Sequence, residues 1–433
     1  MQREHWSTSF GFIAAAVGCA VGLGNIWLFP WRLNAYGVVT FLVPYLTFTF
    51  GFVIFGLIAE LALGRWAQSG AVGAFEKAFP KTRQFPAKVL GLFQTLAQTG
   101  LAVFYLVVVG WILHYLWLAI SGNLNGDNAE QTFDVFTGSA AVLPWHAAAV
   151  LFTISANILG VKKGLERLNR WAVPGLFILL GLLILRSLTL PGALNGLRQA
   201  LIPDWSLLLS SEIWVMALGQ SFFTVSLGGM LIYGSYLKRD IDLRRTSFWI
   251  VIFNIAASLM AALVIIPAAI AFGQDLGRGP GLLFITMPQL FDRMPFGGLI
   301  EIVFFVGVTL AALSSAVNLL EIPTEAVMHL TGQKRPLAAG FAGAAILTGG
   351  ITLALDMGRF GAFVDLVTIY LYPAGVLAIV LAGQWILGSA VIRNEINIAA
   401  RKPFGLWLEF HLRFVFVAVC LLVIALNVIY SGI

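Results

Sequence analysis

The chain contains little of what enzymes and secreted scaffolds depend on. Charged residues make up 11% of its 433 residues, and there are only five histidines and two cysteines. The cysteines, Cys19 and Cys420, are so far apart in sequence that neither a disulfide framework nor a metal site is indicated. No paired carboxylates, histidine cluster or activated nucleophile gather in the apolar segments, so the sequence argues against an enzyme.

Nucleotide-binding patterns and long polar segments are also missing. The Gly22-x-Gly24 pair follows no predicted strand and opens no βαβ unit, so it does not indicate a dinucleotide site. No polar stretch is long enough to fold into an ATPase domain. Any transport by this protein must therefore be driven by an ion gradient.

Hydrophobic residues dominate the chain instead. They make up 59% of it, the mean hydropathy is +0.91, and this composition predicts an all-α integral membrane protein. Eleven apolar segments each approach the roughly 20 residues that a membrane-spanning helix needs. The predicted spans are 10–34, 40–64, 89–120, 144–161, 171–189, 211–236, 246–272, 299–328, 337–355, 363–388 and 408–430.

Basic residues are distributed unevenly between the two sides of these spans. If the N-terminus is cytoplasmic, most of the 26 lysines and arginines lie inside, and the outer loop at 121–143 has none. We therefore expect a multi-pass protein of the cell inner (plasma) membrane with an external C-terminus. The net charge of +6 then reflects topology and contact with anionic membrane lipid, and we expect no nucleic-acid partner. We expect a monomer or a weak dimer.

Two of the spans carry residues that interrupt a helix. The first contains Gly18, Gly22, Asn25 and Pro30, and the sixth contains the polar run Gln220–Gly229. Where a helix is interrupted at membrane depth, its backbone amides and carbonyls lose their helical hydrogen bonds and need other protein groups or a ligand as partners. The midplane binding site of a transporter is built in this way. The alternative for the first span is that Gly18 and Gly22 only allow close helix packing.

The two interruptions lie five helices apart, and this spacing predicts two inverted five-helix repeats. The whole chain, 1–433, would then be a single transmembrane transporter domain. The repeats would cover roughly 10–189 and 211–388, with an extra helix at roughly 408–430.

Neutral oxygen donors occur near these interruptions. Asn254 and Ser258 lie one turn apart in the seventh span, and Ser314 and Ser315 are adjacent in the eighth. Such donors suit a hard cation such as sodium. Asn254 is costly to leave unpaired in lipid, whereas the hydroxyl of Ser258 can bond to a carbonyl of its own helix.

Together these residues resemble the neurotransmitter:sodium symporter family, which has the LeuT-type fold. The resemblance covers nearly the whole chain, and the motifs that carry it are Arg3–Trp6, Gly18–Pro30, Lys163–Arg167, Gln220–Gly228, Tyr233–Tyr236 and Ala311–Glu321. It implies a sodium-coupled symporter that works by alternating access. The implied substrate is a small amino acid or a related molecule with a carboxylate, and the implied ions are Na⁺ and Cl⁻.

The resemblance also implies which residues hold each ligand. A first sodium site would use Ala20, Asn25, Thr224 and Asn254. A second would use Gly18, Val21, Ala311, Ser314 and Ser315. Chloride would lie against Tyr45, Gln220, Thr224, Asn254 and Ser258. The substrate would contact Gly22, Leu101, Tyr105, Phe223, Ser226, Ser315 and Leu319, and the gating residues would be Arg3, Trp6, Tyr236 and Asp365.

Four positions bear on which ligands the protein binds and on which residues could form its gates. Ser258 occupies the position where chloride-independent relatives carry an acid, which predicts chloride dependence, and Gly22 occupies the position of an aspartate in amine carriers. Leu28 replaces the arginine that would pair with Asp365 across the outer vestibule, and His329 replaces an aspartate of the inner gate. Two alternatives stay open, namely a proton-coupled carrier of the same fold and a ligand-binding sensor or receptor without transport.

Overall fold

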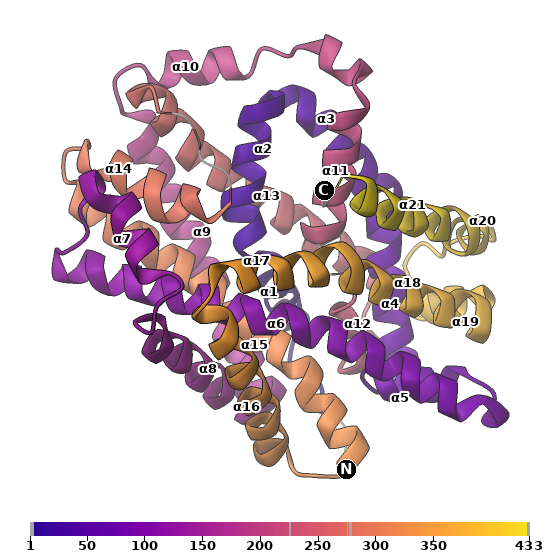
Figure 1. Ribbon diagram of the computed structural model, residues 1–433. Helices are drawn as coiled ribbons and strands as arrows, with labels where there is room; N and C mark the ends of the chain where they lie inside the picture. Colours follow the sequence, from indigo (N-terminus) through magenta and orange to yellow (C-terminus); the bar gives the residue numbers. More distant parts are fainter. Residues whose placement is uncertain (1–3, 225–226, 275, 277–278, 431–433) are drawn as a thin grey trace.

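The computed structural model describes residues 4–224, 227–274, 276 and 279–430, and all regular structure in these ranges is helical. Figure 1 shows the arrangement of the helices. The α-helices of the first half are α1 (Ser9–Ala20), α2 (Phe29–Tyr36), α3 (Val38–Phe48), α4 (Ile54–Ala67), α5 (Ala71–Ala78), α6 (Gln84–Ser121), α7 (Ala129–Phe136), α8 (Val142–Ile158), α9 (Arg167–Leu188) and α10 (Ala193–Ala200). Those of the second half are α11 (Ser211–Thr224), α12 (Met230–Ser235), α13 (Leu243–Phe272), α14 (Met287–Asp292), α15 (Gly297–Thr331), α16 (Arg335–Ala354), α17 (Met357–Asp365), α18 (Tyr372–Leu381), α19 (Ser389–Asn397), α20 (Trp407–Phe410) and α21 (Phe416–Ile429).

Within the described residues, eight continuous helical stretches are long and apolar enough to cross a membrane. Two bent pairs bring this number to ten if each pair is one span: Ser9–Ala20 with Gly24–Tyr36, and Ala193–Leu209 with Ser211–Phe222. The predicted fourth span corresponds to α8, whose 17 residues make it shorter than the others. The all-helical membrane class is therefore confirmed, while the count of eleven spans stays a prediction.

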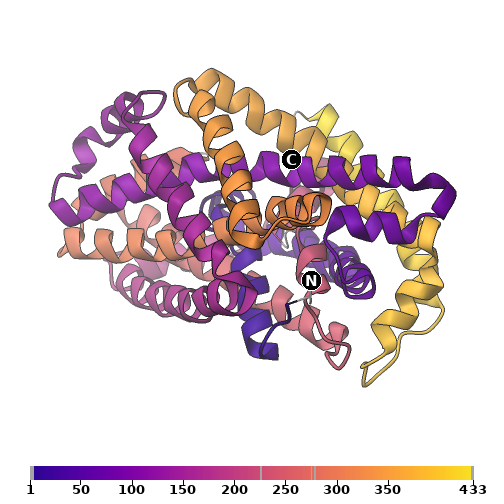
Figure 2. The ribbon, with the colours of Figure 1, turned by 90° about the horizontal axis from the view of Figure 1, so that it is seen from below.

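Two long helices form the centre of the bundle, and the last helix lies at its edge. Figures 1 and 2 both show α6 crossing the molecule from one side to the other. In Gly297–Thr331, which is α15, 72% of the apolar window is buried inside the protein, against 28% in Trp407–Ile429. Because the burial of Trp407–Ile429 is so low, most of its apolar surface is available to lipid.

The first interruption lies where the sequence predicts it. The side chain of Thr8 caps the start of α1 by accepting a hydrogen bond of 2.9 Å from the amide of Gly11. After Ala20 the backbone leaves the helical region at Val21, and the two halves of the span meet at 62°. The bend turns carbonyl oxygens at the end of α1 away from the helix ladder, so they are free to bind a ligand.

The second interruption lies between α11 and α12 and is held by side chains of other helices. Gly228 has a φ of +92°, a conformation that glycine adopts without strain. The buried carboxylate of Glu60 accepts hydrogen bonds of 2.8 Å from the amides of both Gly228 and Leu231. The amide of Gln94 donates to the Gly228 carbonyl at 2.6 Å. The sequence predicts the break itself but does not identify Glu60 and Gln94 as its supports.

Candidate functional site

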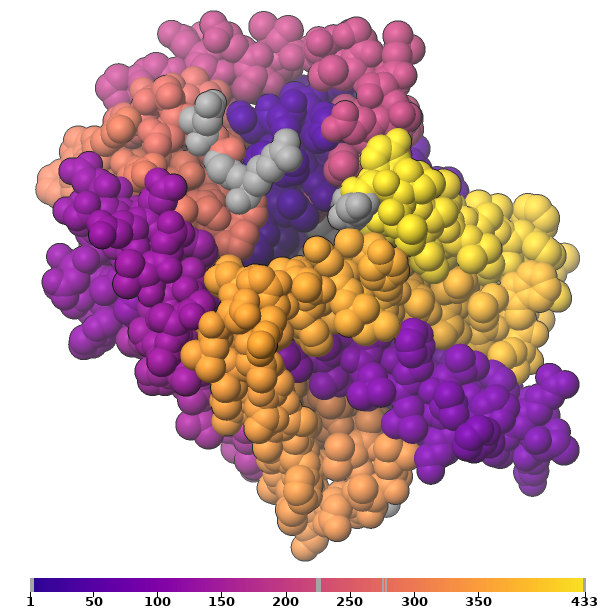
Figure 3. All heavy atoms as spheres, viewed as in Figure 1, coloured from indigo at the N-terminus to yellow at the C-terminus, as the bar shows by residue number. Residues whose placement is uncertain are grey.

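A cavity of about 360 Å³ lies beside the first interruption and extends toward Asp365. Figure 3 shows the molecular face hollowed between the indigo first helices and the orange segment around α17. Its walls are mostly apolar, with a few polar groups, as is usual for small-molecule sites. The predicted site residues among its lining are Ala20, Gly22, Asn25, Leu101, Tyr105, Ser315, Leu319 and Asp365.

The five residues predicted for the second sodium site come together where α1 passes α15. The hydroxyl of Ser315 donates to the Gly18 carbonyl at 2.8 Å and to the Val21 carbonyl at 3.3 Å. The hydroxyl of Ser314 lies 3.2 Å from the Gly18 carbonyl oxygen and 2.8 Å from that of Ala311. Three carbonyl and two hydroxyl oxygens therefore form one buried cluster from residues almost 300 positions apart.

The two asparagines predicted for the first sodium site also meet. The Asn25 amide donates to Oδ1 of Asn254 at 2.7 Å, and both side chains are buried. Ala20 lies at the end of α1, and its carbonyl accepts a hydrogen bond of 3.0 Å from the amide of Gly22. The side chain of Thr224, the fourth predicted ligand, lies outside the described residues.

Four of the residues predicted for the anion site, Tyr45, Gln220, Asn254 and Ser258, are buried, and two of them carry donors without acceptors. Within the described residues, Nε2 of Gln220 and Nδ2 of Asn254 have no hydrogen-bond partner. Tyr45 is fully buried as well. The hydroxyl of Ser258 donates to the Asn254 carbonyl at 3.0 Å, so it forms the bond within its own helix that the sequence allows.

The predicted substrate residues surround a space that a side chain at position 22 would narrow. A Cβ atom built on Gly22 would lie 3.5 Å from the Tyr105 hydroxyl oxygen and 3.4 Å from that of Ser315. Leu101 and Leu319 add apolar surface to the same cavity. The side chain of Phe223 and the whole of Ser226 lie outside the described residues.

Comparison with known proteins identifies the family. A model described as the sodium:neurotransmitter symporter family matches residues 3–141 and 139–432. The chain belongs to this family. YhdH of Bacillus subtilis, described as an uncharacterised sodium-dependent transporter, is 34% identical, and the match covers 98% of this chain and 97% of YhdH.

Two further relatives bear on the ligands of this symporter. The crystal structure of MhsT in complex with L-phenylalanine superposes with a TM-score of 0.86, at 35% identity over 98% of this chain and 100% of that one. The sodium- and chloride-dependent GABA transporter 2 of Bos taurus is 27% identical over 73% of this chain and 60% of its own length. These relatives are transporters, so the symporter is not an enzyme, and its LeuT-type fold is confirmed.

Aromatic residues pack together near the N-terminus, at the end of the first span that is predicted to be cytoplasmic. The Trp6 indole donates to the Tyr233 carbonyl at 3.2 Å and stacks on the Tyr233 ring at a centroid distance of 5.3 Å. It also meets the ring of Tyr236 edge-on at 6.2 Å. Of the predicted gating residues, Trp6 and Tyr236 are thus brought together, while Arg3 lies outside the described residues.

The predicted outer gate lacks its ion pair. Leu28 and Asp365 both line the cavity, and no ion pair is formed by Asp365 within the described part of the chain. The guanidinium of Arg32, one turn after Leu28, bonds instead to Gln220 and to the Met216 carbonyl. An arginine nearby in sequence therefore does not take over the missing gate contact.

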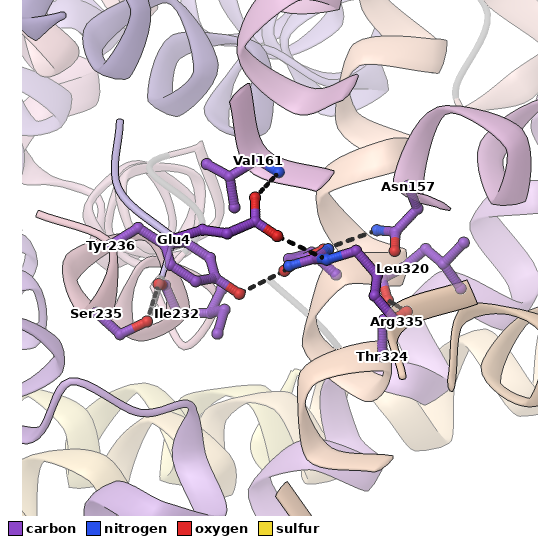
Figure 4. Close-up of polar contacts among 10 residues, drawn as sticks. Glu4, Asn157, Val161, Ile232, Ser235, Tyr236, Leu320, Thr324 and Arg335 are labelled. Atoms are coloured by element: carbon purple, nitrogen blue, oxygen red, sulfur yellow. Dashed lines mark hydrogen bonds and ion pairs between the residues drawn. The ribbon is translucent and has the colours of Figure 1, made fainter. Parts of the chain in front are cut away.

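An ion-pair network lies at the same predicted inner end, where the family resemblance implies an aspartate at the position of His329. Figure 4 shows the Arg335 guanidinium and the carboxylate of Glu4 with which it pairs. Arg335 also bonds to the carboxylate of Glu321, which accepts a further hydrogen bond from the Tyr236 hydroxyl. Two bonds of 2.7 and 3.0 Å join the Arg335 guanidinium to Glu321, and Nε of Arg335 lies 3.1 Å from the Glu4 carboxylate. His329 itself pairs with Glu76 at 2.8 Å. The sequence marks Glu321 only as the end of a motif, and nothing in it signals Arg335 as its partner.

A polar residue that the sequence does not single out lies against the cluster of carbonyl and hydroxyl oxygens. Asn169 of α9 is fully buried, and its amide donates to the Leu165 carbonyl at 2.8 Å. Its Oδ1 has no partner in the described part of the chain, and a Cβ atom built on Gly18 would lie only 1.9 Å from it. The signal in the sequence is a polar residue two positions after the Lys163–Arg167 motif, but the direction of its side chain depends on how α9 packs on α1.

Proposed function

We propose that this symporter couples uptake of an apolar amino acid to sodium and requires chloride. The observation that carries the proposal is the buried cluster of carbonyl and hydroxyl oxygens formed by Gly18, Val21, Ala311, Ser314 and Ser315 beside a substrate-sized cavity. We place the protein in the plasma membrane with its N-terminus in the cytoplasm. The two interruptions would belong to inverted repeats at roughly 10–189 and 211–388.

The oxygen cluster favours sodium over a proton as the coupling ion. Neutral carbonyl and hydroxyl oxygens bind hard cations through their lone pairs and hold no proton that could be exchanged near neutral pH. The end of α1 adds the negative pole of its helix dipole. Uptake into proteoliposomes should be lost when potassium replaces sodium. Undiminished uptake in potassium, driven by a pH gradient, would support the proton-coupled alternative instead.

The space between Gly22, Tyr105 and Ser315 suits a carboxylate, and Leu101 and Leu319 suit an apolar side chain. Because the similar MhsT structure contains L-phenylalanine, this amino acid is the first probe to test. We expect L-phenylalanine and other apolar amino acids to raise the melting temperature of the purified protein in sodium. Amines that lack the carboxylate should give no shift, and a larger shift with such amines would contradict the substrate assignment.

Two buried hydrogen-bond donors support the proposal that the symporter binds chloride. Nε2 of Gln220 and Nδ2 of Asn254 are N–H donors without acceptors among the described residues, and such donors suit an anion. Ser258 is neutral, so it provides no fixed negative charge to offset a bound cation, which is costly to leave uncompensated in a low-dielectric site. A bound chloride would offset this charge, and sodium and chloride should then raise each other's affinity by the same factor.

The test of chloride dependence compares two salts and one variant. Sodium-driven uptake should fall when gluconate replaces chloride, and Ser258→Glu should remove this dependence because its carboxylate supplies the negative charge. Equal activity of the parent protein in both salts would contradict the chloride part of the proposal while leaving sodium coupling intact.

A sensor that binds ligand without transport is the second candidate, and the missing ion pair between positions 28 and 365 favours it. Such a sensor would bind labelled L-phenylalanine in sodium but would not exchange it across a liposome membrane. Counterflow of the label into preloaded liposomes would therefore exclude the sensor.

A further inference from the structure

A buried arginine lies beside the proposed chloride site without an acidic partner. The side chain of Arg32 in α2 is only 4% exposed. Its Nη1 donates to Oε1 of Gln220 at 2.8 Å and to the Met216 carbonyl at 3.1 Å. No carboxylate of the described residues forms an ion pair with Arg32. A buried positive charge without a counter-ion is unfavourable at membrane depth, so an anion close to it would be stabilising.

The contact with Arg32 fixes the orientation of the Gln220 amide. A glutamine amide presents an acceptor on one side and two donors on the other, and in isolation it can be turned either way. A guanidinium has only donors, so it can hold only the Oε1 end of the amide. Nε2 of Gln220 therefore points away from Arg32, and it is buried with no acceptor among the described residues.

Arg32 also borders a second cavity that adjoins the substrate cavity. This cavity measures about 160 Å³, and its lining includes Arg32, Thr368, Tyr372 and Asn427. Thr368 and Tyr372 line the substrate cavity too, so the two spaces share a wall. Nε of Arg32 is buried and has no hydrogen-bond partner within the described residues.

We propose that Arg32 is a positioning residue of the anion site, an inference that rests on the proposed chloride dependence. It holds the acceptor end of the Gln220 amide and so directs Nε2 toward the anion. Its buried charge raises the affinity for the anion, and Arg32 lines a cavity that shares a wall with the substrate cavity. The anion is a small monovalent ion, with chloride as the physiological case.

The experiment measures chloride affinity directly, without any substrate. The full-length protein in detergent is held at constant sodium while gluconate is exchanged for chloride, and the rise in melting temperature gives the half-saturating chloride concentration. The variants are Arg32→Gln, Arg32→Lys and, as a matched control, Arg198→Gln at an exposed arginine of α10. The same titration with bromide and nitrate gives the anion selectivity.

Arg32→Gln should raise the half-saturating chloride concentration by about tenfold or more, because charge-assisted interactions are lost. Arg32→Lys should recover part of this loss, since it keeps the charge but lacks the planar fork that holds an amide oxygen. Selectivity between chloride and nitrate should change in Arg32→Gln, which a purely structural role would not produce. Arg198→Gln should match the parent.

A second variant keeps the proposal testable if Arg32→Gln does not fold. Gln220→Glu places a carboxylate beside Arg32 and should abolish the response to chloride while sodium still stabilises the protein. An unchanged chloride affinity in Arg32→Gln, or a full chloride response in Gln220→Glu, would overturn the role of Arg32 alone. A parent protein that does not respond to chloride would overturn both this inference and the chloride dependence on which it rests.

Discussion

Gly18 lies at the centre of the oxygen cluster that we propose binds sodium, at a position with no room for a side chain. Its carbonyl is the point where the hydroxyls of Ser314 and Ser315 meet, and its Cα faces the buried amide oxygen of Asn169. The sequence indicates a glycine-rich break here. The close approach of Asn169 is the additional reason that a larger residue does not fit at this position.

Gly18→Ala should therefore disrupt the second sodium site. The new Cβ would lie 1.9 Å from Oδ1 of Asn169, so the buried Asn169 side chain or one of the two helices must shift, at a cost of about 1–3 kcal/mol. We expect a lower melting temperature and a marked loss of sodium-induced stabilisation. Gly181→Ala is the control, because its Cβ would have no heavy atom within 4 Å and should be neutral. Equal sodium responses in the two variants would be inconsistent with this site.

Tyr105→Phe tests the substrate end of the same cavity. It removes one hydroxyl that is placed to bind a charged carboxylate, and such hydrogen bonds contribute about 1.5–3 kcal/mol. Affinity for the amino acid substrate should fall by roughly tenfold to a hundredfold, while the response to sodium alone is retained. Calorimetric or thermal-shift titration with L-phenylalanine measures this change. Unchanged affinity would remove Tyr105 from the site.

At the scale of elements, the second helix break depends on α4 for its stability. Each carboxylate oxygen of Glu60 accepts a hydrogen bond from one amide of the break, that of Gly228 or that of Leu231. Local sequence can end a helix at glycines, but the amides that this frees must find acceptors elsewhere. Here α4 supplies them across a separation of 168 residues.

Glu60→Ala should destabilise the break between α11 and α12. Each buried amide that loses its acceptor costs about 1–3 kcal/mol, and Glu60→Gln, which keeps one acceptor oxygen, should cost less. The melting temperature should follow the order parent, Gln variant, Ala variant. Glu130→Gln, at an exposed position of α7, is the control for removal of a carboxylate. An Ala variant as stable as this control would mean that the two amides do not depend on Glu60.

At the scale of the whole molecule, with the N-terminus in the cytoplasm as we propose, contacts of the N-terminal segment close the inner end while the central cavity extends toward Asp365. The inner closure combines the aromatic packing of Trp6 with the network around Glu321, whose side chain is fully buried. Toward the outer side, Leu28 cannot form the ion pair with Asp365 that the family resemblance implies. Of the two ends of the proposed pathway, the inner end is therefore the one held closed by ion pairs among the described residues.

Arg335→Ala should favour opening of that inner end. Removing one partner of a buried ion pair costs about 3–5 kcal/mol, because the carboxylate of Glu321 is left uncompensated. We expect faster hydrogen–deuterium exchange in residues 4–20 and 230–237 in the presence of sodium. The exposed Arg359→Ala serves as control, and the double variant Glu321→Gln/Arg335→Gln should exchange more slowly than Arg335→Ala. If exchange in these segments is unchanged by Arg335→Ala, the network does not hold the inner end closed.

The sequence predicts those parts of the site that depend on residue type and on short stretches of chain. The break in the first span follows from its glycines and Pro30, and the neutral oxygen donors follow from Asn254, Ser314 and Ser315. The residues predicted for the second sodium site come together because the motifs of the family fix its fold, while their binding of sodium stays a prediction. The helical stretch Met357–Asn397 extends beyond the predicted span 363–388 at both ends, and its backbone leaves the helical region at Gly388, where the predicted span ends.

By itself, then, the sequence determined a helical membrane protein with two interrupted helices and the chemical kind of ligand that they suit. The tertiary structure alone decided which side chains complete those interruptions. Arg32 and Gln220 are 188 residues apart, and Arg335 meets both Glu321 and the distant Glu4. Composition and local propensity act over a few turns of helix, whereas the direction and partner of a buried charged side chain depend on how distant helices pack.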